Sequence, residues 1–313
     1  FVRVAILGFG RFDLVMLFIT FLVSFPETLI TAIPEVPGPL ERAYIVIKFT
    51  ITTFFYHIYK FLMIIWIASY PKSGNTWLRA LLSSYFYSKN GEFNFELLKN
   101  IDSFPSERFF KDYSDEFNEP EDTCKYWLQE QEKINKSKKN IFLKTHNALC
   151  KINNNIFTNK ENSIGAIYIV RDPRNVITSI SHHYQLTIND ALKFMTDEKK
   201  GIYVKKDGRY VAFQPLLSWS LNQKSWLENN MFPVMIIKYE ELISETFITF
   251  KKVLNFIYKI TNSKILTDRK KIINSIKNCE FQNLKKLEKE KGFEEAAYDK
   301  NTKEKIKFFN LGQ

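Results

Sequence analysis

The chain has 313 residues, of which 45% are hydrophobic and 25% are charged. This is the composition of a globular protein with a buried core, and it excludes disorder, a collagen-like repeat and a coiled coil as descriptions of the whole chain. Lysine and arginine number 45 against 34 aspartate and glutamate, which gives a formal net charge of +11 at pH 7. Such an excess favours an anionic partner: a nucleotide, a nucleic acid, a sulfated or phosphorylated small molecule, or a membrane surface.

The first part of the chain, residues 1–61, is hydrophobic and differs from the rest. Its two apolar runs span residues 14–25 and 43–59, and both are shorter than the ~20 residues that a helix needs to cross a bilayer. The second run also carries Lys48 and His57, which are unfavourable at the centre of a membrane. Three interpretations stay open: a membrane anchor, a docking segment, or a stretch that is not native to the domain, which the lack of an initiating Met favours.

From residue 62 onward, short apolar runs alternate with segments of helical periodicity. The expected strands span residues 63–69, 141–145, 164–170 and 233–238, and the expected helices span residues 76–87, 173–183, 214–229 and 245–260. The strands lack the polar alternation of a half-exposed sheet, as expected for a parallel sheet covered on both faces. We therefore predict an α/β domain over residues 62–313, with a P-loop-like three-layer fold in which helices flank a central parallel sheet. Residues 89–140 are interpreted as a helical insertion and residues 264–291 as a charged helical segment.

The three cysteines, Cys124, Cys150 and Cys279, lie far apart and form no C-x-x-C pair. This spacing argues against a disulfide framework and against a zinc site. It is typical of a reducing compartment. We therefore expect a cytoplasmic protein without a metal, and association with a membrane through residues 1–61 is left open.

The residues after each expected strand carry the chemistry, because ligands of a parallel sheet bind outside the carboxyl ends of its strands. Lys72 follows the first strand, Lys144 and His146 lie at the end of the second, Arg171 ends the third and Tyr239 follows the fourth. Cations that gather at one edge of a sheet predict a crevice that binds an anion. The chain has no recognisable nucleic-acid recognition element, so we expect no nucleic-acid partner.

The most specific signal is the loop after the first strand, residues 70–77, which reads Tyr-Pro-Lys-Ser-Gly-Asn-Thr-Trp. Gly74 allows a tight turn, and the helix that begins beyond it exposes free N–H groups that attract phosphate or sulfate. Lys72 adds a charge, and Ser73 and Thr76 add hydroxyl donors. The loop is not a Walker A loop, because its lysine precedes its only glycine. The alternative is a plain strand–turn–helix with a surface lysine.

Four segments together resemble the cytosolic-type sulfotransferases, which use 3′-phosphoadenosine 5′-phosphosulfate (PAPS) as the sulfonate donor. Residues 70–77 resemble the 5′-phosphosulfate loop of that family, with Asn75 where Thr is usual, and residues 169–179 are similar to its 3′-phosphate motif. Residues 144–146 match the segment that bears the family's catalytic histidine, and residues 238–242 match a later strand end. The order and spacing agree over about two-thirds of the chain, and the two phosphate motifs together are highly specific.

The resemblance implies a donor site that is divided among these segments. It assigns the 5′ end of PAPS to Lys72 and to the loop residues Ser73, Gly74, Asn75, Thr76 and Trp77. It assigns the 3′-phosphate to Arg171 and Ser179, and the adenine to Trp77, Tyr239 and Phe281. Trp77 and Phe281 are equally explained as core aromatic residues.

The resemblance further implies that the protein transfers a sulfonate group to a hydroxyl or amine of a small-molecule acceptor. A sulfonate in transit carries less charge than a phosphoryl group, so lysines and a helix dipole can stabilise it. His146 is then the general base, because the ordinary pKa of histidine is close to neutrality. Lys72 neutralises the leaving phosphate oxygen, and Lys144 assists it. The alternative for His146 is a structural role, and His182 and His183 are interpreted as packing or surface groups.

The chain departs from the family near its C-terminus. The family's Arg-Lys-Gly element, a second clamp on the 3′-phosphate, would fall at residues 308–312, where Asn310 and Leu311 replace both cations. We expect either a truncated C-terminus or a weaker affinity for the donor. Cys279 stands where the family often has Thr near the adenine. Two other functions stay open: a P-loop-type small-molecule kinase, which the missing Walker A pattern opposes, and a degenerate, non-catalytic nucleotide-binding protein.

Overall fold

The computed structural model describes residues 63–113, 117–137 and 140–309. The predictions for residues 1–61 lie outside the described residues, so the anchor, docking and non-native interpretations stay predictions, as do the domain boundary and the cytoplasmic location. Within the described ranges, no helix is both long enough and apolar enough to cross a membrane.

The core of the fold is a five-stranded sheet in the order β2-β3-β1-β6-β9, and all neighbouring strands are parallel. Its strands are β1 (Ile64–Ser69), β2 (Asp102–Ser103), β3 (Ile141–Thr145), β6 (Ser163–Val170) and β9 (Val234–Lys238). Strand β1 lies in the middle, with β3 on one side and β6 on the other. The strand order therefore reverses direction at β1, and such a switch point opens a crevice at the carboxyl ends of the strands.

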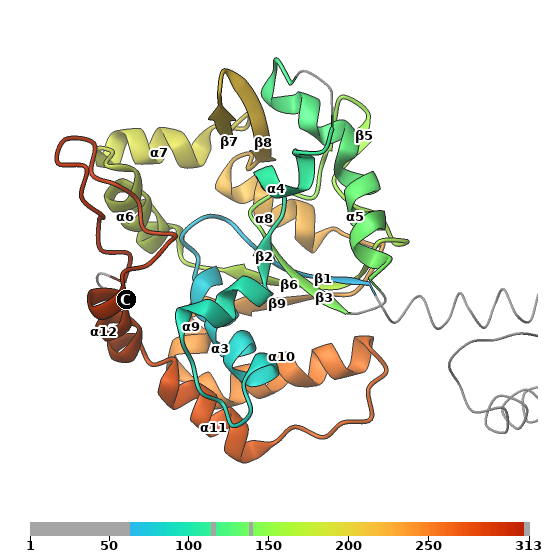
Figure 1. The fold of residues 1–313 in the computed structure, drawn as a ribbon, viewed down its shortest axis with the longest axis vertical. Helices are drawn as coiled ribbons and strands as arrows, with labels where there is room; N and C mark the ends of the chain where they lie inside the picture. Colours follow the sequence, from blue (N-terminus) through green and yellow to red (C-terminus); the bar gives the residue numbers. More distant parts are fainter. Residues whose placement is uncertain (1–62, 114–116, 138–139, 310–313) are drawn as a thin grey trace, which may run out of the picture. The chain divides into compact units, whose positions relative to one another are not determined.

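Helices cover both faces of this sheet (Figure 1). One face carries α3 (Asn75–Tyr87), α9 (Tyr239–Ser244), α10 (Thr246–Ile260) and α11 (Arg269–Asn278), and the other carries α4 (Glu107–Phe110), α5 (Trp127–Asn135) and α8 (Trp219–Leu227). Alternate side chains of β1 serve the two cores: Ile65 and Ile67 pack into the first, and Ile64 and Trp66 pack into the second. All four are fully buried. The predicted three-layer α/β fold is confirmed.

The remaining elements lie around these layers. They are the 3-10 helices η2 (Phe95–Asn100) and η3 (Pro120–Tyr126), the helices α6 (Pro173–Tyr184), α7 (Ile188–Thr196) and α12 (Phe281–Lys291), and two hairpins formed by β4 (Lys151–Ile152) with β5 (Asn155–Ile156) and by β7 (Gly201–Lys206) with β8 (Arg209–Pro215). The chain beyond α12 runs alongside α6 and α7 (Figure 1). It is joined there by hydrogen bonds from the Gln185 side chain to the Tyr298 carbonyl and from the Lys300 N–H to Gln185.

The expected strands and most of the expected helices match the structure within one or two residues. The prediction of a helix over residues 214–229 is wrong at its start, because Gln214 and Pro215 end strand β8. Helix α8 begins only after Ser218, whose hydroxyl accepts a hydrogen bond from the Leu221 N–H at 3.3 Å. A serine cap of this kind sets the start of a helix.

The charged segment over residues 264–291 is two helices, not one. Helix α11 ends at Asn278. The N–H of the cap residue Cys279 bonds back to the last turn, and Glu280 then takes an extended backbone with φ −56° and ψ 144°. The insertion over residues 89–140 is largely helical, as expected, but it also contributes β2 to the edge of the sheet.

Candidate active site

A cavity of about 510 Å³ lies at the carboxyl ends of β1, β3, β6 and β9. It is lined by every predicted site residue except Ser73, that is, by Lys72, Gly74, Asn75, Thr76, Trp77, Lys144, His146, Arg171, Ser179, Tyr239 and Phe281. Ser73 is fully buried beside them in the chain. Four strand ends that are far apart in the sequence thus contribute to one site, as the strand-end argument predicts.

The loop after β1 has an unusual backbone. Lys72 has a φ of +66° and Gly74 a φ of +99°, and a positive φ is uncommon for a residue other than glycine. A Cβ atom at position 74 would overlap the Tyr239 ring, whose Cε2 would be 2.7 Å away. Gly74 therefore serves two needs: the left-handed turn that starts α3 and the close approach of Tyr239 to the loop.

The start of α3 faces the cavity with hydrogen-bond donors. The cap residue Gly74 has no side chain to satisfy the first N–H groups of the helix, and such groups together with the helix dipole attract anions. The buried Ser73 hydroxyl has no hydrogen-bond partner among the described residues. The Asn75 amide instead donates to the Ile67 carbonyl at 2.9 Å and ties the helix to β1. The loop is thus suited to an anion, and Asn75 holds the loop in place.

Two cations converge on this loop. Arg171 donates from Nη1 to the Lys72 carbonyl at 3.0 Å, and its guanidinium lies 4.4 Å from the centre of the Tyr239 ring. The Lys72 ammonium lies 3.8 Å from the centre of the Phe308 ring. Burial lowers the pKa of Lys72 to about 8, and the nearby charges of Lys144 and Arg171 add to the shift. A bound anion would therefore relieve repulsion among these cations.

His146 is held in one orientation by its neighbours. Its Nδ1 lies 2.8 Å from the Ser69 carbonyl, and because a carbonyl only accepts, Nδ1 carries the proton and Nε2 is left as the acceptor. The backbone carbonyl of His146 accepts a hydrogen bond from the Asn222 amide at 3.0 Å. Burial lowers the pKa of His146 to about 3, with a further contribution from Lys144. The imidazole is therefore neutral at pH 7 with Nε2 unprotonated, but in the free protein it is a weaker base than the near-neutral pKa expected from the sequence.

Sequence reasoning missed both carboxylates that line this cavity, Glu280 and Glu295, and the one that pairs with cations of the site is Glu295. It forms an ion pair with Lys144 at 3.3 Å and a second ion pair with Arg79. Burial lowers the pKa of Lys144, and Glu295 opposes that shift. Glu295 lies 151 residues from Lys144 in the chain, beyond the last helix. Neither a motif nor a strand end marks it in the sequence.

The three side chains predicted to contact the adenine, Trp77, Tyr239 and Phe281, all line the cavity. The rings of Trp77 and Tyr239 meet edge to face, with centroids 6.0 Å apart and an angle of 76°. The Trp77 indole donates to the Cys279 carbonyl at 2.9 Å. Trp77 and Phe281 are only partly buried, and they both pack against the core and line the cavity. Trp77 and Phe281 therefore fit both interpretations: they pack against the core, and they also line the cavity that would hold the adenine.

Helix α6 contributes more residues to the cavity than expected. His182 and His183, interpreted above as packing or surface groups, both line it together with Ser179. Burial lowers the pKa of His183 to about 4, and Lys72 and Lys144 contribute. The signal that could have found them is helical spacing, because residues three and four positions after Ser179 share its face.

The side chains that could ligate a metal do not cluster in the described part of the chain. No cluster of three or more His, Cys, Asp or Glu side chains there could hold a metal ion, and the three cysteines are free. Burial raises the pKa of the Cys150 thiol to about 11. This thiol is therefore protonated at neutral pH.

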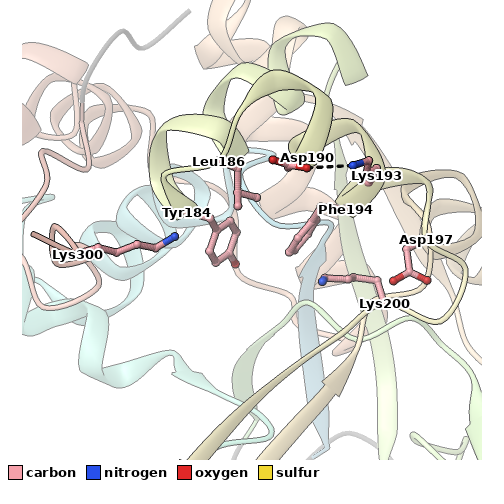
Figure 2. A pocket seen from close by; sticks show the side chains of 8 residues that line it. All are labelled: Tyr184, Leu186, Asp190, Lys193, Phe194, Asp197, Lys200 and Lys300. Atoms are coloured by element: carbon pink, nitrogen blue, oxygen red, sulfur yellow. Dashed lines mark hydrogen bonds and ion pairs between the residues drawn. The ribbon is translucent and has the colours of Figure 1, made fainter.

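A second cavity, of about 660 Å³, adjoins the first at Tyr184, which lines both. In Figure 2 the Tyr184 and Phe194 rings lie side by side, with Lys300 on one flank and Lys200 on the other. The ring centroids are 5.2 Å apart, and the Asp190–Lys193 ion pair of 3.2 Å lies at the rim. None of the predicted site residues lines this second cavity.

The fold and the first cavity define an α/β protein in which cations gather at the carboxyl ends of a parallel sheet, an arrangement suited to an anionic ligand. The model of the family described as "Sulfotransferase domain" matches residues 64–313, and the chain belongs to this family. The predicted cofactor, PAPS, is the donor that this family uses. A search of curated proteins finds no match. Among solved structures, the chain is similar to retinol dehydratase in a complex with retinol and PAP, with 18% identity, 80% of this chain and 74% of that chain covered, and a TM-score of 0.45.

Proposed function

We propose that this protein transfers a sulfonate group from PAPS to a hydroxyl or amine group of a small-molecule acceptor. The observation that carries the proposal is the convergence of Lys72, Arg171 and His146 on one cavity from three different strand ends. The two cations fit an anionic nucleotide, and the neutral imidazole fits a proton acceptor. Membership of the sulfotransferase family supports the reaction class.

The two charged ends of the donor would be held by different elements. The start of α3, with Lys72 and the orphaned Ser73 hydroxyl, fits the 5′ end, because both the helix dipole and the unpaired donors favour negative charge. Arg171 and Ser179 fit the 3′-phosphate, since they lie on the strand end and the helix that follow β6. The aromatic rings of Trp77, Tyr239 and Phe281 fit the adenine.

The chemistry assigns one task to each polar side chain. PAPS supplies the sulfonate group, whose bond to the 5′-phosphate oxygen breaks as its bond to the acceptor forms. His146 takes the proton of the acceptor at Nε2, because its Nδ1 is engaged with the Ser69 carbonyl. Lys72 stabilises the charge on the leaving oxygen, with Lys144 beside it. The negative charge of a bound donor would also raise the pKa of His146 and make it a stronger base.

The second clamp on the 3′-phosphate remains a prediction. Asn310 and Leu311, which stand where the family has cations, lie outside the described residues. The chain just before them does reach the cavity, which Lys307, Phe308 and Phe309 help to line. The Glu288 carboxylate accepts hydrogen bonds from the N–H groups of Phe308 and Phe309, at 2.6 and 3.0 Å. We therefore expect donor affinity to depend on the residues that follow.

The test is turnover with a defined donor. The protein is incubated with PAPS and with a panel of small alcohols, phenols and amines, and the formation of adenosine 3′,5′-bisphosphate is followed. We expect acceptor-dependent formation that the His146→Ala variant loses. Formation at the same low rate with and without acceptor, in both proteins, would contradict the proposal. Magnesium-dependent consumption of ATP with the same acceptors would instead support the kinase alternative.

A further inference from the structure

A carboxylate of the protein itself lies on the part of the site assigned to the 5′ end of the donor. The Oε2 atom of Glu295 accepts a hydrogen bond from the Thr76 hydroxyl at 3.3 Å and lies 3.3 Å from the Lys144 ammonium. Its Oε1 atom pairs with Arg79 at 2.5 Å. Glu295 thus connects the first turn of α3 to Lys144, the residue before the last of β3.

The Glu295 carboxylate is charged at neutral pH. Burial alone would raise its pKa, but Lys144 and Arg79 together hold the pKa of Glu295 well below its usual range. A full negative charge therefore lies beside the helix N-terminus, in the cavity where Lys72 and Lys144 gather. This is the charge type that a helix N-terminus favours.

We propose that Glu295 is a specificity-determining residue of the donor site, which holds Thr76 and Lys144 until an anion at the 5′ end of the ligand displaces it. The inference rests on the proposed function, because it takes the start of α3 as the site of the 5′ group. Two anions cannot share the same hydroxyl and ammonium without strong repulsion. The affinity for any 5′-charged ligand is therefore lowered by the free energy needed to displace the carboxylate.

The local geometry allows a partial displacement. Only Oε2 contacts Thr76 and Lys144, whereas Oε1 contacts Arg79. Arg79 is itself fixed, because it is buried and also donates to the Ile101 carbonyl at 2.9 Å. Rotation of the Glu295 side chain can therefore free Thr76 and Lys144 while the pair with Arg79 persists. Phe293 and Ala296, on either side of Glu295 in the chain, are buried and hold the backbone in place, so we expect the displacement to be a side-chain movement.

The proposal predicts a dependence on ligand charge that a purely structural role would not produce. Neutralising Glu295 should tighten the binding of ligands that carry a 5′-phosphate. It should leave unchanged the binding of ligands that lack this group, because they do not reach Thr76 or Lys144. A residue that merely supports the fold would weaken both kinds of ligand or neither.

The test compares Glu295→Gln with Glu294→Gln by calorimetric titration. The first variant removes the charge and keeps an oxygen for Arg79, and the second removes the same charge from an exposed neighbour that pairs with Lys99 at 3.5 Å. We expect Glu295→Gln to bind adenosine 3′,5′-bisphosphate about tenfold more tightly than the wild type, and adenosine 3′-monophosphate with unchanged affinity. We expect no change for Glu294→Gln. An equal gain in both variants, a gain for both ligands, or no gain would overturn the proposal.

A second probe separates this inference from the proposed function. Inorganic sulfate should raise the melting temperature of Glu295→Gln at lower concentrations than that of the wild type, whatever nucleotide the protein binds. Absence of bisphosphate binding together with this sulfate effect would contradict the proposed function and leave Glu295 as a competitor for anions. Bisphosphate binding without any effect of Glu295→Gln would contradict only the role of Glu295. If Glu295→Gln does not fold, Glu295→Asp takes its place, because it shortens the side chain and should give a smaller gain of the same sign.

Discussion

Arg171 Nη1 donates a hydrogen bond to the backbone carbonyl of Lys72 at 3.0 Å, although the two residues are 99 positions apart. The bond joins the end of β6 to the loop after β1, and these strands are neighbours in the sheet. Both residues line the same cavity. The two motifs assigned to opposite ends of the donor are therefore in contact, because they follow neighbouring strands. A substitution of Arg171 should therefore also affect the Lys72 loop.

Arg171 can be compared with a second arginine of the same segment. Arg171→Ala should weaken the binding of adenosine 3′,5′-bisphosphate roughly 10- to 100-fold, the effect of losing a charge-assisted contact. Arg174→Ala is the matched control, because the Arg174 side chain is 88% exposed and pairs only locally with Asp172. It should bind the bisphosphate as the wild type does. Equal losses in the two variants would mean that net charge, and not the clamp, determines the affinity.

His146→Ala should separate binding from turnover. We expect its affinity for the bisphosphate to stay within about twofold of the wild type and its turnover to fall by about 10²- to 10⁴-fold, the usual contribution of a general base. Added imidazole should restore part of the turnover, because it can take the place of the lost ring. A variant with normal turnover, or one that loses binding and turnover together, would remove the general-base assignment.

Bisphosphate affinity should depend on pH through Lys72. In the free protein its pKa is about 8, and a bound anion raises it, so binding takes up a proton above pH 8. The affinity should therefore be full below pH 8 and should fall as the pH rises above it, by up to about tenfold per pH unit. The buried Lys144, whose pKa is also lowered, acts in the same direction. Titrations between pH 7 and 9.5 measure the slope, and Lys72→Arg should flatten it, since an arginine stays protonated.

Two glycines distinguish backbone strain from the contact with Tyr239. Gly74 and Gly208 both have positive φ, +99° and +82°, but a Cβ atom would overlap Tyr239 only at Gly74 and would meet nothing within 4 Å at Gly208. Gly208→Ala should cost about 1 kcal/mol of unfolding free energy, from the left-handed backbone alone. Gly74→Ala should cost about 1 to 3 kcal/mol more and should weaken bisphosphate binding. Urea unfolding of both variants measures the difference, and equal costs would show that the loop can move away from Tyr239.

Much of the fold could be predicted because the central strands are buried on both faces. Strands β1, β3, β6 and β9 appear in the sequence as short apolar runs with no polar alternation. The hairpin of β7 and β8 could not be found in this way, because the last four residues of β7 are exposed and the hairpin lies outside the central sheet. Strand β2 is only two residues long, Asp102 and Ser103, and carries no apolar signal.

The sequence could predict those site residues that directly follow a strand of the central sheet. Lys72, His146, Arg171 and Tyr239 each follow a strand of the sheet, and parallel strands bring such residues to one edge. Glu295 follows no strand and lies in a segment whose position depends on tertiary packing around Phe293. Residues of this kind are found only when the fold is known.

The central claim is that the Lys72 loop and Arg171 hold opposite ends of one nucleotide. The most direct test is calorimetric titration of the wild type and of Lys72→Ala with adenosine 3′,5′-bisphosphate and with adenosine 3′-monophosphate. The account predicts that the wild type binds the bisphosphate more tightly than the monophosphate, and that Lys72→Ala loses this preference while it binds the monophosphate as before. The account is contradicted if the wild type binds neither ligand, or if Lys72→Ala weakens both ligands equally.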